Sequence, residues 1–184
     1  MASPPADQGA AAPRLSTTPP LVLVLMGVSG VGKTTLGLEL AATLGWDFVE
    51  GDAFHSAANV EKMSRGIPLD DDDRRPWLDA LARVIADRIR KGKRSIVACS
   101  ALKRKYRERL RDGSDRVGFV HLEADYESIA RRLRSRYGHF AKVDLLASQF
   151  ETLEAPEPDE GVLVIDAMAD PRESIRRIRE AFGV

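Results

Sequence analysis

Residues 27–34 read Gly-Val-Ser-Gly-Val-Gly-Lys-Thr, and they constrain this chain more than any other stretch. They match the phosphate-binding loop pattern G-x-x-x-x-G-K-S/T at every required position. The run before them, residues 21–26, is apolar throughout, as expected for a parallel strand buried on both faces. Residues 34–42 follow with leucines at helical spacing. Strand, loop and helix in this order predict a site for the phosphates of a nucleotide.

The chemistry of this loop depends on its glycines and on its last two side chains. Glycines let backbone N–H groups turn toward phosphate oxygens, and the start of the following helix adds a favourable dipole. In this pattern Lys33 reaches the β- and γ-phosphates and the Thr34 hydroxyl ligates Mg²⁺. A tight turn that binds nothing is the alternative, but it needs no lysine or threonine at these offsets. The expected nucleotide-binding residues are Gly27, Val28, Ser29, Gly30, Val31, Gly32, Lys33, Thr34 and Thr35.

Length and composition narrow the class of protein. A chain of 184 residues with 43% hydrophobic residues suits one domain with a full core. Its 28 basic and 28 acidic residues balance, so we expect no nucleic-acid or membrane partner. The only cysteine, Cys99, excludes an internal disulfide and lies in an apolar run that predicts a core position. We expect a cytoplasmic protein with a disordered tail over residues 1–20 and a single domain over residues 21–184.

Four more apolar runs predict strands, at residues 46–50, 95–99, 117–122 and 162–165. Together with the first run they alternate with helical segments, which predicts an α/β sandwich around a five-stranded parallel sheet. Asp52 and His55 directly follow the second strand. Ligands of such sheets bind beyond the carboxyl ends of the strands, so we expect both side chains near the phosphate loop.

Three charged segments have two interpretations each. The acidic run 70–73 is either solvated or caps the start of a helix, which we expect from about Pro76. The basic segment 103–111 is either a solvated helix face or a surface that meets an anionic substrate in its first turn. Residues 132–142 join an arginine-rich helix to a second helix through Gly138, which predicts a mobile lid. An ordinary helical hairpin with a solvated basic face is the alternative there.

Several motifs together resemble the gluconate kinases, small-molecule kinases with an adenylate-kinase-like fold. The matching stretches span residues 26–154 in the family's order, and they are residues 26–33, 51–55, 59–69, 71–78, 99–103, 138–140 and 148–154. Ser56 and Ala141 depart from the family, which often has proline and an aromatic residue there. The resemblance implies ATP-dependent phosphorylation of D-gluconate to 6-phospho-D-gluconate. It also implies a five-stranded parallel sheet with the phosphate loop at its centre, a closing lid and a homodimer.

With this resemblance, roles can be assigned to side chains beyond the loop. Asp52 either holds the substrate hydroxyl and accepts its proton or holds a magnesium-bound water, and the sequence leaves both open. His55 and His139 are candidates for contacts to the sugar acid. Arg132 and Arg136 would meet the phosphates after lid closure. Four basic residues are candidates for the substrate carboxylate: Arg65, Arg74, Lys103 and Arg104. Adenine is expected near the lid and Ala167.

Two other activities share part of this pattern. Shikimate kinases share the loop and an aspartate after the second strand, but they use a glycine triplet, and this chain has no adjacent glycine pair. A GTPase-type switch would need a D-x-x-G motif after a strand and an N-K-x-D motif. Residues 115–118 fit the first pattern but precede their strand, and the second pattern is absent from the sequence.

Overall fold

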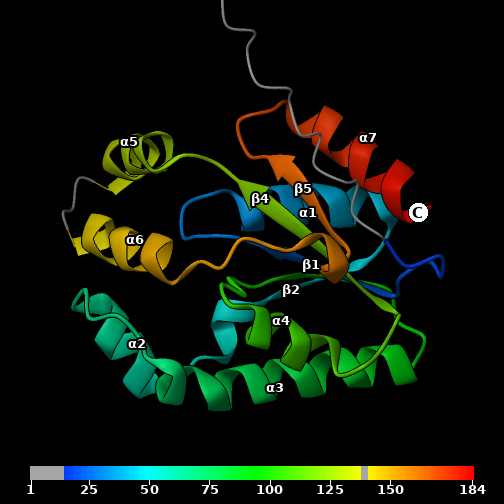
Figure 1. Cartoon of the computed structure of the whole chain (residues 1–184), viewed down its shortest axis with the longest axis horizontal. Coiled ribbons are helices and arrows are strands. Elements are labelled where there is room, and N and C mark those ends of the chain that lie inside the picture. The colour runs from blue at the N-terminus through cyan, green and yellow to red at the C-terminus, as the bar shows by residue number, and fades with distance from the viewer. Residues whose placement is uncertain (1–14, 138–140) are drawn as a thin grey trace, which may run out of the picture.

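The computed structural model of the chain describes residues 15–137 and 141–184. Its centre is a five-stranded sheet in which every neighbouring pair of strands is parallel (Figure 1). The strands are β1 (Val22–Met26), β2 (Asp47–Glu50), β3 (Ser95–Ala98), β4 (Val117–Glu123) and β5 (Val162–Asp166). Their spatial order is β2-β3-β1-β4-β5, so β1 and its phosphate loop are central. The predicted sheet and its five strands are confirmed, with strand ends that differ by one residue.

Helices cover both faces of this sheet, which explains the continuous apolar character of β1. On one face lie α1 (Lys33–Leu44) and α7 (Pro171–Phe182), and on the other lie α3 (Asp71–Arg90) and α4 (Arg104–Arg111) (Figure 1). The side chains of Leu23 and Leu25 pack with α1 and α7 in a first core layer. Those of Val22 and Val24 pack with α3 and α4 in a second core layer. Cys99 is fully buried in the second layer, and burial raises the pKa of its thiol to about 12, so it is the core residue that was predicted.

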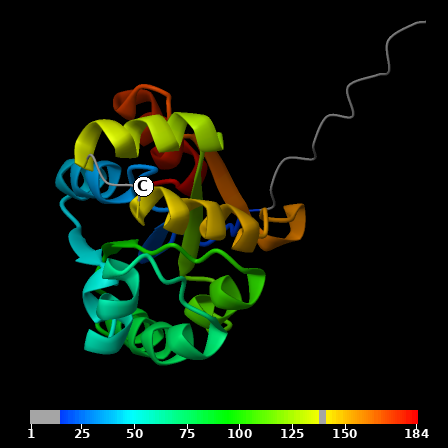
Figure 2. The same ribbon diagram turned by 90° about the vertical axis from the view of Figure 1, so that its left-hand side faces the viewer.

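Three further helices gather at the carboxyl ends of the strands. These are α2 (Ala57–Ser64), α5 (Tyr126–Tyr137) and α6 (Ala141–Thr152), and Figure 2 views the molecule from their side. The short 3₁₀ helices η1 (Gly51–Phe54) and η2 (Pro158–Glu160) follow β2 and precede β5. The phosphate loop and the segment after β2 therefore open toward the same group of helices, where a ligand of this fold is expected.

Helix α3 begins at Asp71, several residues before the expected start near Pro76. The reason is a capping box: Asp70 Oδ1 accepts from Asp73 N at 2.8 Å, and Asp73 Oδ2 accepts from Asp70 N at 3.2 Å. Pro76 consequently lies inside the helix, where it cannot donate to a carbonyl of the preceding turn. The acidic run thus caps a helix, but one turn earlier than the proline suggested.

At the amino end, residues 1–14 lie outside the described structure, and residues 15–20 have no regular secondary structure. Leu15 packs against the first core layer and Pro20 is buried. Among the helices of the described ranges, none is both long and apolar enough to cross a membrane.

Candidate functional site

The phosphate loop runs between β1 and α1, directly beneath α5. Gly27 has a φ of 134°, and a Cβ on it would lie 2.6 Å from the Leu122 carbonyl oxygen. Gly30 has a φ of 81°, and its Cβ would lie 2.7 Å from a methyl carbon of Leu133 in α5. Both positions require glycine for backbone conformation and for close approach. The glycines of the loop motif therefore also allow β4 and α5 to pack closely against the loop.

Lys33 projects back over the loop that precedes it. Its Nζ donates to the carbonyl oxygens of Gly27 and Val28, at 2.9 Å each. Burial lowers the pKa of this ammonium, and the negative charges of Asp52 and Glu50 oppose the shift. An ammonium held by neutral carbonyls at the mouth of a glycine loop suits an anionic group such as a phosphate.

Oxygen donors that suit Mg²⁺ lie beside this lysine. The Thr34 hydroxyl donates to Glu50 Oε2 at 2.8 Å, and the Asp52 carboxylate lines the same cavity. In the described ranges, no group of three or more His, Cys, Asp or Glu side chains forms a metal cage. Mg²⁺ in phosphoryl-transfer sites is held by one or two carboxylates plus substrate phosphates. One hydroxyl and two carboxylates therefore fit that ion when it arrives with a nucleotide.

His55 forms a second wall of the cavity. Its ring stacks on Trp77 with centroids 4.2 Å apart and planes inclined by 17°, and Trp77 Nε1 donates to the Gly51 carbonyl at 2.8 Å. Burial lowers the pKa of His55, so its ring is neutral near pH 7. Its Nδ1 is buried and has no hydrogen-bond partner among the described residues. A buried ring nitrogen without a partner is costly, which suggests that a ligand completes it.

Arg74, in the first turns of α3, supplies a cation to the same cavity. Only 7% of this residue is exposed, and its guanidinium carbon lies 5.8 Å from the centre of the Tyr106 ring. In the ranges that the structure describes, it forms no ion pair. Buried arginines are normally paired, so Arg74 is ready to receive a carboxylate.

These side chains surround a single cavity of about 520 Å³. It extends from the phosphate loop to α2 and α3, and α5 and α6 close its other side. Besides residues of the loop, its lining includes Glu50, Asp52, His55, Arg74, Trp77, Ser100, Arg132 and Gln149. The volume suits a polar molecule of sugar size next to a phosphate chain.

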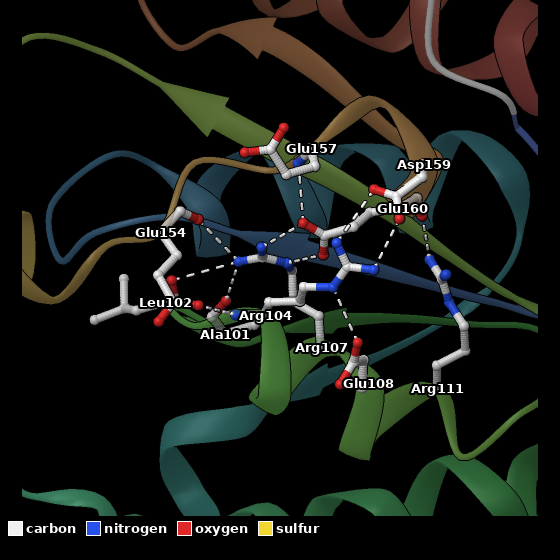
Figure 3. Close-up of polar contacts among 10 residues, drawn as sticks. All are labelled: Ala101, Leu102, Arg104, Arg107, Glu108, Arg111, Glu154, Glu157, Asp159 and Glu160. Carbon is white, nitrogen blue, oxygen red and sulfur yellow. Dashed lines mark hydrogen bonds and ion pairs between the residues drawn. The ribbon is translucent and has the colours of Figure 1, made fainter.

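Other sequence candidates lie elsewhere. Arg65 is exposed, with Nη1 4.0 Å from Glu61, and Lys103 donates to Asp71 at 2.9 Å. Arg104 bonds to Glu108 and to Asp159 (Figure 3). None of these three basic residues lines the cavity. Both Lys103 and Arg104 form ion pairs with acidic side chains in the structure, so their expected contact with the substrate stays a prediction that the cavity lining does not support.

The same helix holds a buried ion pair. Arg107 donates to both carboxylate oxygens of Glu160 at 2.6 and 2.7 Å, and the two side chains are 2% and 5% exposed. Arg107 also donates to the Glu154 carbonyl at 3.0 Å (Figure 3). This pair joins α4 to the segment between α6 and β5, so Arg107 has a structural role.

Helices α5 and α6 contact the phosphate loop directly. Arg132 Nη1 of α5 donates to the Val31 carbonyl at 3.1 Å, and Gln149 Oε1 of α6 accepts from Ser29 N at 2.6 Å. The Arg136 side chain and all of His139 lie outside the described residues, so their expected roles stay predictions. Helices α5 and α6, which we call the helical hairpin, thus contact the loop on both sides of Gly30.

Among the cavity residues that sequence reasoning missed are Glu50, Trp77, Ser100 and Gln149. Glu50 ends β2 and Ser100 follows β3, so the rule about carboxyl ends of strands would have found both. Trp77 has the spacing of a core residue, and it packs in the core as well as supporting His55. Gln149 carries no local signal, because its partner Ser29 is 120 residues away in sequence.

A second, smaller cavity adjoins the loop on the α1 side. It has a volume of about 280 Å³, and its lining includes Thr35, Arg132, Ala167 and Met168. This is the region near Ala167 where adenine is expected. Arg132 lines both cavities, so one molecule can extend from the second cavity to the first along the phosphate loop.

Comparison with known proteins adds to this geometry. The family model described as an AAA domain matches residues 22–156. The thermosensitive gluconokinase of Escherichia coli (strain K12) is 46% identical over 159 residues, which cover 86% of this chain and 85% of that protein. The chain is also similar to a gluconokinase from Sinorhizobium meliloti 1021 that has a crystal structure. The two sequences are 39% identical, and the structures match with a TM-score of 0.80 over 92% of this chain and 94% of that chain. A shikimate kinase from Bacteroides thetaiotaomicron matches over 89% of this chain and 98% of that chain, with a TM-score of 0.63. Its sequence is only 19% identical, so this likeness shows a shared fold alone.

Proposed function

Because this chain belongs to the gluconokinase family, we propose that it transfers the γ-phosphoryl group of ATP to D-gluconate and yields 6-phospho-D-gluconate and ADP. One observation about the site carries this proposal. A single cavity has the phosphate loop and Lys33 at one end and, at the other, the buried Arg74, which has no ion-pair partner among the described residues. A small acid with a hydroxyl far from its carboxylate fits both ends at once.

The nucleotide end uses the loop. Backbone N–H groups of the loop and the start of α1 hold the phosphates, and Lys33 exchanges its two carbonyl partners for phosphate oxygens. Arg132 lies between the two cavities, where it can contact the phosphates, and adenine occupies the cavity beside Ala167. Thr34 and Glu50 would hold Mg²⁺, which supplies positive charge to the phosphate oxygens.

Phosphoryl transfer depends mainly on positioning and charge neutralisation. The 6-hydroxyl oxygen of gluconate forms a bond to the γ-phosphorus, and the bond between that phosphorus and the bridging oxygen of ADP breaks. Asp52 accepts a hydrogen bond from the hydroxyl and then its proton. The Asp52 side chain is 69% exposed, and its Oδ1 lies 4.0 Å from Nε2 of His55. Lys33 neutralises charge on the phosphate oxygens.

The substrate end fixes the acid. The planar guanidinium of Arg74 offers two parallel N–H donors to the gluconate carboxylate. Neutral His55 offers its buried Nδ1 to a sugar hydroxyl, and Trp77 keeps the ring in place. Because Arg74 already lies buried against Tyr106, little side-chain freedom is lost on binding.

Other expectations accompany this activity as predictions. They are homodimer assembly, a cytoplasmic location, a disordered tail over residues 1–20 and closure of a lid over residues 132–142. The family resemblance supports the dimer and the lid. Contact of α5 and α6 with the phosphate loop supports a role for this hairpin in sensing the nucleotide.

The direct test is substrate selection. The purified chain is incubated with Mg-ATP and, separately, with D-gluconate, other sugar acids, shikimate and nucleoside monophosphates, and ADP release is followed. We expect turnover with D-gluconate far above the rest. Faster turnover of shikimate than of gluconate would favour the alternative kinase activity.

A further inference from the structure

Among the described residues, Gln149 of α6 makes the shortest polar contact between helices α5 and α6 and the phosphate loop. Its Oε1 lies 2.6 Å from Ser29 N, and the residue lines the main cavity with Lys33 and Asp52. A backbone N–H can only donate, so the atom facing it must be the amide oxygen. The orientation of the side-chain amide therefore follows from its partner and is unambiguous.

The peptide that Gln149 contacts also holds Lys33. Val28 contributes the carbonyl of this peptide, which accepts from Lys33 Nζ at 2.9 Å, and Ser29 contributes the N–H. The C=O and N–H of a trans peptide point in opposite directions within one plane. Gln149 on one side and Lys33 on the other thus hold one rigid unit, so the glutamine helps to set the position of the lysine.

The NH₂ group of the Gln149 side chain has no hydrogen-bond partner in the described part of the chain. Its Nε2 carries two N–H donors and makes no hydrogen bond to any described residue. It is bonded to the same carbon as Oε1, so it lies beside the loop at the edge of the cavity. Donors in such a place are suited to anionic oxygens that arrive with a ligand.

We propose that Gln149 is a catalytic residue of the phosphate site: its Oε1 holds the Val28–Ser29 peptide, and its Nε2 donates to an oxygen of the phosphoryl group in transfer. This rests on the proposed kinase activity and assigns a role to the 148–154 motif, which otherwise has none. The residue type follows from the double task. A glutamate would also accept from Ser29 N, but it would offer no donor and would repel the phosphate.

That difference defines the test. Gln149→Glu retains the contact to Ser29 N and loses the donor, whereas Gln149→Ala loses both. Glu151 is an exposed residue of the same helix that does not line the cavity, so Glu151→Gln is the matched control with the reciprocal change. For each protein, kcat and KM with gluconate, affinity for a non-hydrolysable ATP analogue and the thermal midpoint are measured.

We expect kcat of Gln149→Glu to fall by about 100-fold, the usual loss when one preorganised donor is removed. Analogue affinity should fall as well, because a carboxylate then faces the phosphates. Gln149→Ala should lose less kcat than Gln149→Glu, and Glu151→Gln should match the unmodified chain. Nearly normal kcat for Gln149→Glu would overturn the proposal and leave Gln149 as a tether.

Two further outcomes are decisive. If Gln149→Glu fails to fold, normal kcat of Gln149→Ala overturns the proposal, and a loss of about 10-fold or more with an unchanged thermal midpoint supports it. If the unmodified chain does not turn over gluconate, the proposed function fails. The analogue affinities then decide the glutamine's role alone: Gln149→Glu binding as tightly as the unmodified chain overturns it, and weaker binding supports it.

Discussion

Replacing Arg74 by glutamine tests how the substrate acid is recognised. Arg74 is the one cation among the four sequence candidates that lines the cavity, and it has no carboxylate partner in the described ranges. Glutamine keeps a polar side chain but loses the charge and the two-pronged geometry. We expect gluconate to bind more weakly and nucleotide to bind as before, because the nucleotide contacts the loop at the other end of the cavity.

The size of the effect follows from burial. Hydrogen bonds that involve a charged group contribute about 1.5–3 kcal/mol each, and the Arg74 guanidinium is shielded from solvent. Part of a two-bond contact is retained by glutamine, so we expect a loss of about 2–3 kcal/mol in transition-state binding. At 1.36 kcal/mol per factor of ten, kcat/KM for gluconate should fall about 30- to 150-fold.

Steady-state kinetics with two substrates separates recognition from general damage. D-Glucitol has a hydroxymethyl group in place of the gluconate carboxylate, so its kcat/KM should change little in Arg74→Gln. Arg75→Gln is the control, since Arg75 is exposed and pairs with Asp72. Thermal unfolding checks that the contact with Tyr106 is not essential for the fold. An equal loss for gluconate and glucitol would refute carboxylate binding by Arg74.

Three other predictions follow from named groups. Asp52→Asn should lower kcat about 100-fold, the range of general acid–base groups, with unchanged affinity for an ATP analogue in calorimetry. Glu160→Gln should lower the free energy of unfolding in urea by about 3 kcal/mol or more, because Arg107 is left buried and charged. Burial, with a smaller contribution from the charge of Arg107, lowers the pKa of His121 from 6.5 to about 4. Between these two pH values the unfolded chain binds a proton at His121 that the folded chain does not bind, so the free energy of unfolding rises with pH. Acidification from neutral pH to pH 4 should therefore lower the free energy of unfolding by about 3 kcal/mol. His121→Gln should flatten that part of the stability profile.

Each of these predictions has a contradicting result. An Asp52→Asn loss that shrinks at high Mg²⁺, with weaker nucleotide binding, would assign Asp52 to the metal instead of the hydroxyl. Urea unfolding of Glu160→Gln at the unmodified midpoint would mean that water solvates Arg107. An identical acid profile for His121→Gln would show that other groups dominate unfolding below pH 6.5.

The parts of the fold that the sequence predicted are those specified by near neighbours. The loop, its strand and its helix are contiguous, and Gly45 ends α1 in the left-handed conformation that glycine favours. Asp52 and His55 were found because they directly follow a strand. The largest difference is at the start of α3, where the capping box of Asp70 outweighs the helix-breaking tendency of Pro76.

Contacts between distant segments set the rest of the site. Arg104 and Arg74 look alike in sequence, yet Arg104 pairs with Asp159, which is 55 residues further on, and Arg74 finds no such partner in the described ranges. Which arginine remains free for a substrate therefore depends on the packing of α4 against the segment before β5 (Figure 3). Gln149 depends in the same way on α6 reaching the loop.

The most direct test of the central claim is the position of the transferred phosphoryl group. The chain is incubated with Mg-ATP and ¹³C-labelled D-gluconate, and phosphorus–carbon couplings in the product are measured by NMR. We expect one product, with phosphorus on the oxygen of C6, formed in equal amount to ADP. Phosphorylation at another carbon, or ADP release without phosphorylated gluconate, would contradict a cavity that holds the carboxylate at Arg74 and the 6-hydroxyl at Asp52.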